Sequence, residues 1–323
     1  MAISSSDIKF YKSTAVNDTD SNGGKISSTR IVTNTLNNLF PNVTSAERTA
    51  GVTRYRKMFM KNENASDLTL ESTKVYIGML SSGEDYFRFK DGTDTDIQSQ
   101  ADDYTNWHGS GSLYQNVSSG ESSIEVTYDV ANGVFSGESV LLKIDDGTNS
   151  EEVQLIGAPS WAGEVATLNF TPVTTNSFVA GTTVVSTILD LDSIVAASSA
   201  WTETSAAGTY DESTYSVVMY NPGAVSDNWT LTFSSATVFS VAGALTGSLG
   251  AGNISTNFMP ANGSSYYFKI DKSGWGGTWA SGDTITFTTT HSAKAVWVKE
   301  VVPAGCAALS NNAVRFDWEG ESA

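Results

Sequence analysis

Short runs in which apolar and polar residues alternate recur along most of this chain. Clear examples are Tyr55–Met60, Ser123–Tyr128, Trp229–Phe233 and Thr284–Thr288. Because successive side chains of a strand point to opposite faces, this alternation predicts half-buried β-strands. The chain is therefore expected to be mainly β, with two or three β-sandwich or β-meander modules.

One segment carries a helix signal instead. Thr44 and Glu47 have the spacing of a capping box, with a hydroxyl at the N-cap and a carboxylate at N3. Gly51 is suited to the left-handed conformation that ends a helix. The pattern predicts one short helix, which must be held by packing because it is too short to be stable alone.

Residues 1–43, which precede this helix, are polar with scattered apolar anchors. We expect them to form an extended N-terminal arm with one or two short strands. Such an arm can lie on a neighbouring subunit, although packing on its own domain is the default expectation. Residues 44–115 are then expected to form a first β module that includes the short helix.

The next module is expected at residues 116–200, as a β-meander that ends in a linker. Asp145-Asp146-Gly147 lies between two alternating runs, and Asp-Gly at such a place predicts a hairpin. The stretch 190–213 is rich in Ala, Ser and Thr, which makes it the best linker candidate.

Residues 201–323 are expected to form an immunoglobulin-like β-sandwich. About six short runs at close spacing favour that architecture. The last two of these expected strands are Ala295–Lys299 and Val314–Trp318.

The balance of charge limits the partners of the chain. It has 18 Lys and Arg against 35 Asp and Glu, for a net charge of −17. Binding to nucleic acid or to an anionic membrane needs clustered cations, so neither partner is expected. Residues 1–7 have no basic or apolar part of a signal peptide, and we expect synthesis in a bacterial host cytoplasm.

No residue set predicts a catalytic, metal or cofactor site. Asp18–Gly23 matches the start of a calcium loop, yet its last ligand position falls on Thr29, so a polar turn is the better interpretation. His108, His291 and Cys306 are too few for a structural zinc site. Further acids that we interpret as solvated turns are the cluster Asp91, Asp94 and Asp96 and the pairs Asp102-Asp103 and Glu151-Glu152.

Tryptophans next to glycines suggest a carbohydrate site as an alternative. Trp161, Trp275 and Trp279 have this context, which could expose ring faces for stacking on sugars. Apolar strands surround them, so tryptophans that cover the end of a sandwich core are favoured.

A basic run stands out in this acidic chain. Arg54 and Arg56 are expected on one face of a strand, with Lys57 and Lys61 on the other. The run is a possible subunit interface, because it could meet an acidic neighbour such as another copy of the chain. A charged strand edge that discourages aggregation explains it equally well.

Several segments resemble one family of tailed-bacteriophage virion proteins. They are Gly23–Ser27, Asn37–Val43, Arg54–Asn62, Val296–Gly305 and Trp318–Glu321. The resemblance touches both ends of the chain and carries no catalytic residue. It implies a structural subunit of the virion, at the neck or collar or in the tail.

Two functions follow as hypotheses. The first is a non-enzymatic structural subunit that forms a homo-oligomeric ring and contacts other phage structural proteins, without a cofactor. The alternative is a carbohydrate-binding, receptor-binding or decoration protein on a phage fibre, baseplate or capsid surface.

Overall fold

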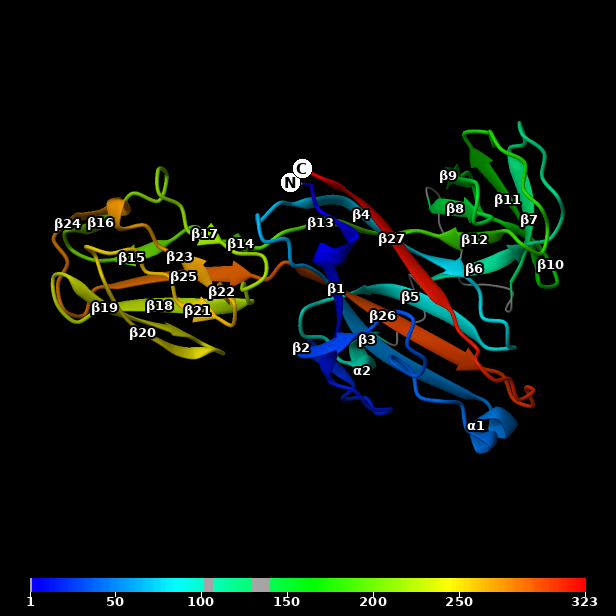
Figure 1. Cartoon of the computed structure of the whole chain (residues 1–323), viewed down its shortest axis with the longest axis horizontal. Helices are drawn as coiled ribbons and strands as arrows, with labels where there is room; N and C mark the ends of the chain where they lie inside the picture. The colour runs from blue at the N-terminus through cyan, green and yellow to red at the C-terminus, as the bar shows by residue number, and fades with distance from the viewer. Residues whose placement is uncertain (1, 102–106, 129–139) are drawn as a thin grey trace.

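The computed structural model describes residues 2–101, 107–128 and 140–323, and it is mainly β, as the sequence predicts. Three lobes are visible (Figure 1). A central sandwich holds both chain ends, a middle lobe comprises residues 107–188, and a distal lobe comprises residues 195–292. Ile3 and Ser322 lie side by side, since the Ile3 N–H donates to Ser322 Oγ over 3.1 Å.

The central sandwich has two sheets with an apolar core between them. One sheet has the order β5-β26-β3-β1-β2, and the other has the order β13-β4-β27. Their bounds are β1 Ile8–Ala15, β2 Gly23–Ile31, β3 Val52–Asn62, β4 Leu70–Met79, β5 Tyr86–Gly92, β13 Leu189–Ile194, β26 Ala293–Val302 and β27 Arg315–Ser322. The core between the sheets includes Met60, Ile77, Phe89, Leu191 and Val298.

The middle lobe is a sheet closed on itself. The pairings run from β6 through β7, β11, β9, β8 and β12 back to β6, all antiparallel. The bounds are β6 His108–Leu113, β7 Ser123–Thr127, β8 Leu141–Asp145, β9 Ser150–Leu155, β10 Ser160–Ala162, β11 Val165–Thr171 and β12 Val184–Thr187. Each of these six strands therefore has a partner on both sides over part of its length, and the closed sheet encloses an apolar core of inward side chains.

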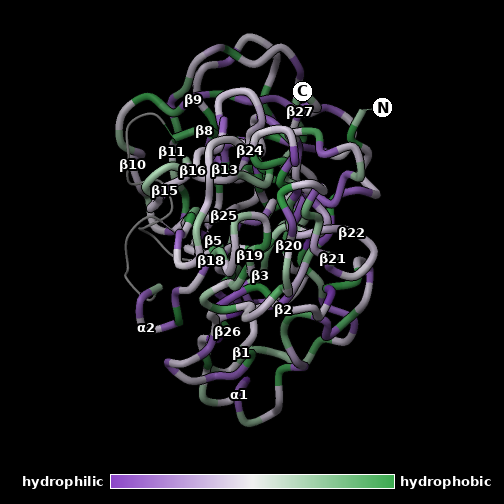
Figure 2. The backbone as a smooth tube through the Cα atoms, turned by 90° about the vertical axis from the view of Figure 1, so that its left-hand side faces the viewer, coloured by the Kyte–Doolittle hydropathy of each residue, from purple (hydrophilic) through white to green (hydrophobic). Residues whose placement is uncertain are grey.

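The distal lobe packs a six-stranded sheet against three two-stranded sheets. The large sheet contains β14 Ala197–Ser198, β15 Thr202–Thr204, β18 Asp227–Phe233, β19 Val238–Gly243, β20 Gly247–Asn253 and β25 Thr284–Thr290. The small sheets pair β16 Gly208–Tyr210 with β24 Trp275–Gly277, β17 Val218–Met219 with β23 Phe268–Lys269, and β21 Ala261–Asn262 with β22 Ser265–Tyr266. One face of the large sheet is apolar and buried, and its other face carries exposed Thr, Ser and Asn. Many strands accordingly alternate in hydropathy along the tube (Figure 2).

The predicted helix is confirmed as α1 Ser45–Ala50. Thr44 accepts a hydrogen bond from the Glu47 N–H, Glu47 accepts one from the Thr44 N–H, and Gly51 has φ +77°. A second helical turn, α2 Gln98–Ala101, and the 3₁₀ turns η1 Ser5–Asp7 and η2 Lys272–Gly274 were not expected. None of the helices in the described parts of the chain is long and apolar enough to cross a membrane.

The expected N-terminal arm is instead part of the central sandwich. Strand β1 lies between β2 and β3, and it pairs with β3 from Ile8 to Lys12. The segment contains two strands, where one or two were expected, and it packs on its own domain, which was the default expectation, so it does not extend as a separate arm. Periodicity within residues 1–43 could not show this, because the partner strand β3 follows the helix in the sequence.

The expected boundary at residue 201 is wrong for a similar reason. Ala295–Lys299 lies in β26, which pairs with β3 and β5, and Val314–Trp318 overlaps β27, which pairs with β4. Both segments belong to the central sandwich, so the immunoglobulin-like sandwich is not confirmed for residues 201–323.

The predicted linker at 190–213 consists largely of short strands. Part of it lies in β13 of the central sandwich, and the rest contributes β14, β15 and β16 to the distal lobe. The middle and distal lobes are therefore two insertions into one discontinuous sandwich.

Candidate functional site

The basic run of β3 lies inside the molecule. Arg54, Arg56 and Lys57 are buried, and Lys61 is nearly so. Strand β3 runs between β26 and β1, and both of its faces are covered. The expected alternation holds, since Arg54 and Arg56 both lie near the Phe40 ring while Lys57 lies near Trp297 on the other face.

Arg54 forms the most buried ion pair of this run. Its guanidinium lies 2.5 Å from the Glu300 carboxylate on β26, and the two side chains are 2% and 5% exposed. The same guanidinium donates to the Pro41 carbonyl over 3.0 Å. Burial raises the pKa of Glu300, and the Arg54 charge acts in the opposite direction. The pair fixes the register of β3 against β26.

Lys57 is held by three acceptors. Its Nζ lies 2.5 Å from Asp96 Oδ1 and donates to the carbonyls of Gly24 and Asp96 over 2.8 and 3.2 Å. The Trp297 indole N–H donates to the other Asp96 oxygen over 2.7 Å. Burial lowers the pKa of Lys57, and Asp96 opposes that shift. This arrangement anchors the loop before α2 to the sheet.

The other two cations also find partners within the chain. Arg56 lies 2.6 Å from the Asp18 carboxylate and donates to the Asn17 carbonyl. Lys61 donates to the Pro222 carbonyl over 2.8 Å, and its ammonium is 3.6 Å from Glu63. The acidic neighbours that the structure supplies to the run are residues of the same chain. Sequence reasoning missed Glu300 and Asp96 because they lie far from β3 along the sequence.

A polar junction locks the distal lobe to the central sandwich. Asn62 is fully buried, and its side chain donates to the carbonyls of Leu68 and Ile194 over 2.8 and 3.0 Å. Ser292 Oγ donates to the Asn62 and Asn221 carbonyls. Both places where the chain crosses between the lobes, at 194–197 and 290–293, therefore meet at Asn62.

A Ser, His and Asp cluster at this junction does not have the geometry of a hydrolase. Asp94 accepts a hydrogen bond from Ser226 Oγ over 2.7 Å, and His291 Nε2 lies 3.3 Å from the same oxygen. The carboxylate lies between the hydroxyl and the imidazole, whereas a nucleophilic serine needs the imidazole next to it. Burial lowers the pKa of His291, and Asp94 opposes that shift. The cluster ties the loop that carries Asp94 to the distal lobe.

The other acidic segments are structural in the described residues. In the Asp18–Gly23 loop, Asp18 pairs with Arg56 and Asn22 donates to the Tyr55 carbonyl. Glu151 holds the turn at Thr175, while Glu152 pairs with Lys74. No cluster of His, Cys, Asp and Glu within residues 2–101, 107–128 and 140–323 could hold a metal ion. The Asp102-Asp103 pair lies outside the described residues.

The tryptophans of the proposed sugar site are packed in the distal-lobe core. Trp279 is 2% exposed and stacks on Phe233 at 4.3 Å between ring centroids. Trp275 is half-buried against Trp201, Tyr210 and Trp279. In the middle lobe, Trp161 packs on Tyr128. The core interpretation therefore fits the packing, and Trp279 presents no free ring face.

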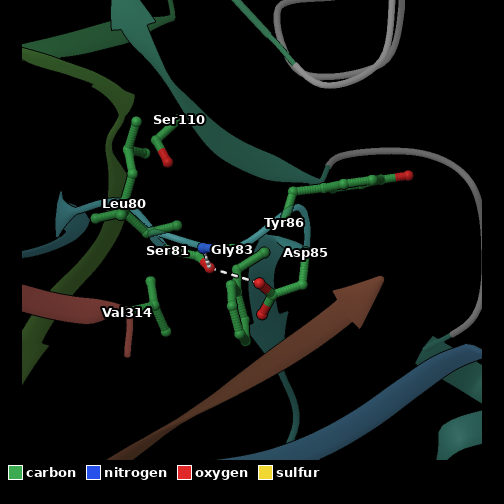
Figure 3. A pocket seen from close by; sticks show the side chains of 9 residues that line it. Leu80, Ser81, Gly83, Asp85, Tyr86, Ser110 and Val314 are labelled. Atoms are coloured by element: carbon green, nitrogen blue, oxygen red, sulfur yellow. Dashed lines mark hydrogen bonds between the residues drawn. The ribbon is translucent and has the colours of Figure 1, made fainter. Parts of the chain in front are cut away.

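A small cavity and an open groove are the hollows to consider as binding sites. A cavity of about 60 Å³ near the start of β5 is lined by Leu80, Val314 and the hydrogen-bonded pair Ser81 and Asp85 (Figure 3). Its volume suits about two water molecules. An open groove of about 310 Å³ lies on the distal lobe beside β25, where polar lining side chains are Ser199, Thr202, Asn228, Thr230, Thr286 and Thr288.

No protein-family model matches the chain, and neither a curated protein nor a solved structure matches it.

Proposed function

We propose that this chain is a non-enzymatic structural subunit of a tailed-phage particle, at the neck or collar or in the tail. The resemblance of its terminal segments to virion proteins motivates the proposal. The main support for the proposal is that buried charged side chains of this protein form ion pairs that hold its own strands, loops and lobes together. Arg54, Lys57, Glu300 and Asp96 hold strands and loops together, and Asp94 with His291 joins two lobes.

The way in which the lobes are attached supports the same proposal. Two chain crossings bind the distal lobe to the central sandwich, and both are hydrogen-bonded to Asn62. The middle lobe shares a continuous sheet with the sandwich through β5 and β6, and Lys143 reaches from it to Glu319 on β27. Such attachments suit a scaffold that must keep its shape under load.

Purified particles test this proposal. A peptide tag after Ala323, which is exposed, allows the chain to be located by gold labelling and quantified by mass spectrometry. We expect a fixed copy number in finished infectious particles and a label at the neck or tail. Absence of the chain from particles that remain infectious would overturn the proposal.

A second candidate function, binding to a surface glycan, is favoured by the open groove of the distal lobe. Its polar lining consists of hydroxyls and one amide, without a charged side chain, and such groups suit the hydroxyls of a sugar. The test is a glycan array with the purified chain and with the variant Asn228→Ala/Thr286→Ala. Binding that this variant abolishes, while Trp161→Ala retains it, would support the candidate. Absence of binding by the unchanged protein would exclude it.

A further inference from the structure

We propose that copies of this chain join head to tail, with the outer edge of β2 of one copy against the middle lobe of the next. This inference rests on the proposed structural function and specifies which two surfaces of neighbouring copies meet. The hairpin patch consists of Lys25, Arg30, Val32 and Leu36. The middle-lobe patch consists of Tyr114, Glu121, Glu125, Val173 and Val179.

The hairpin patch lies along the open edge of the central sandwich. Strand β2 is the last strand of its sheet, and no described strand pairs with its outer edge from Lys25 to Ile31. Beyond it, Val32 and Leu36 are 60% and 51% exposed, in a loop that Asn38 folds back by donating to the Val32 carbonyl. Lys25 is exposed and has no ion-pair partner among the described residues. An open edge with exposed apolar groups is a surface on which another chain can dock.

The middle-lobe patch lies mostly on two paired segments outside the closed sheet, and Glu125 lies on the adjoining strand β7. Residues 114–121 run antiparallel to residues 173–181, with Val117 paired to Phe178. Tyr114, Val173 and Val179 on these segments are each about half exposed. Glu121 is exposed and has no ion-pair partner among the described residues. Twelve large apolar side chains are exposed in the described parts of the chain, and five of them lie in the two patches.

Charge identifies a second copy as the occupant. The described residues of the middle lobe, 107–128 and 140–188, contain seven acidic residues and one cation, Lys143, which is buried and paired with Glu152 and Glu319. Two middle lobes therefore repel each other, and the lobe attracts cations from elsewhere. The hairpin β1–β2 supplies four, Lys9, Lys12, Lys25 and Arg30, against Asp18 and Asp20. Arg30 is 48% exposed and also pairs with Glu63 over 3.2 Å, while Asp18 pairs with Arg56. Apolar groups flanked by cations thus face apolar groups flanked by carboxylates.

The hairpin and the middle lobe lie on different sides of the central sandwich in both views (Figures 1 and 2). One copy cannot satisfy both patches by itself. The contact is therefore heterologous, and it closes a ring when the rotation per copy permits.

Two charge reversals, Lys25→Glu and Glu121→Lys, test the contact in solution. Sedimentation velocity and native mass spectrometry should show assemblies of the unchanged chain at about 0.05 M salt that dissociate towards about 0.5 M. Each variant alone should lose association at least tenfold. A one-to-one mixture of the two variants should recover assemblies larger than a dimer, since each variant supplies the unchanged patch that the other lacks and the two reversed charges also attract each other.

Matched controls separate the patches from charge in general. Glu164→Lys changes an exposed acid elsewhere on the middle lobe, and Lys272→Glu changes an exposed cation of the distal lobe. Both controls should assemble as the unchanged chain does, and circular dichroism should show that all four variants are folded. The contact is overturned by an unchanged chain that stays monomeric, by either patch variant assembling normally, or by a mixture that stays monomeric. Each of these results leaves the proposed function intact, because presence of the chain in particles decides that separately.

Discussion

Arg54 and Glu300 lie 246 positions apart in the sequence, yet their side chains form a buried ion pair 2.5 Å long. The pair joins β3, near the start of the chain, to β26, which follows both inserted lobes. It therefore joins the two parts of the central sandwich that the inserted lobes separate along the chain. Replacing both partners of such a buried pair with apolar residues changes the stability of a protein little, whereas removing only one partner lowers it strongly.

Removing one partner of this pair should destabilise the protein strongly. We expect Glu300→Leu to lower the free energy of unfolding by about 3–5 kcal/mol, because Arg54 then stays buried with only Glu47, 3.7 Å away and 28% exposed, as a counter-charge. The double variant Arg54→Met/Glu300→Leu should recover most of that loss. Urea denaturation followed by tryptophan fluorescence measures both. Additive losses in the double variant would show that the two side chains do not act as a pair.

Asn62 should be the critical residue of the junction between the lobes. Its side chain donates to the Leu68 and Ile194 carbonyls and accepts from the Asn64 N–H. The bonds to Ile194 and Asn64 are buried, whereas the Leu68 carbonyl also accepts from Asn221. We expect Asn62→Ala to cost about 2–4 kcal/mol, since it leaves buried partners unsatisfied. The exposed Asn228→Ala serves as the control and should change stability by less than about 0.5 kcal/mol. Equal effects of the two changes on thermal unfolding would contradict the role of Asn62.

His108 should make the protein sensitive to mild acid. Burial lowers the pKa of His108 to about 4 from 6.5, although Asp91 acts in the opposite direction. Between these values the unfolded chain binds a proton that the folded chain does not, so stability falls as the pH drops from about 6.5 to about 4. The loss attributable to this residue is at most about 3 kcal/mol.

The variant His108→Leu isolates this contribution. Its free energy of unfolding should decline less than that of the unchanged chain over the same pH interval, as measured by urea denaturation at several pH values. Parallel declines for the two proteins would mean that His108 titrates normally in the folded state.

Trp279 should contribute to the stability of the protein by its packing in the core of the distal lobe. Its indole stacks on Phe233, and we expect Trp279→Ala to cost about 3–5 kcal/mol. Trp279→Phe keeps an aromatic ring in the stack and should cost clearly less. Calorimetry of the two variants provides the comparison. A stable Trp279→Ala protein that has lost binding to a glycan would instead favour a binding role.

Local signals in the sequence predicted local structure correctly. The capping box of Thr44 and Glu47 and the stop at Gly51 specify α1 within a few residues, and the structure contains all three features. The turn at Gly147, with φ +83°, joins β8 and β9 as expected. In each case the residues that determine the conformation are neighbours along the chain.

Features that depend on distant partners were not predictable in this way. In the sequence, β1 resembles an isolated strand because its partner β3 follows the helix. Likewise, β26 was assigned to the distal lobe because the 98 residues of that lobe directly precede it. The basic run has the charged composition that is typical of exposed strands. Its burial became evident only from the ion pairs that it forms with Glu300, Asp96 and Asp18. Deleting residues 1–25 would remove β1, which pairs with β3, and would therefore disturb folding as well as assembly. Point substitutions are the better test of assembly.

The most direct test of the structural role is an image of purified infectious particles that carry a label after Ala323. The account predicts label at a fixed station of the neck or tail in every intact particle, with a copy number that matches a closed ring. Particles that are infectious and carry no label would contradict it.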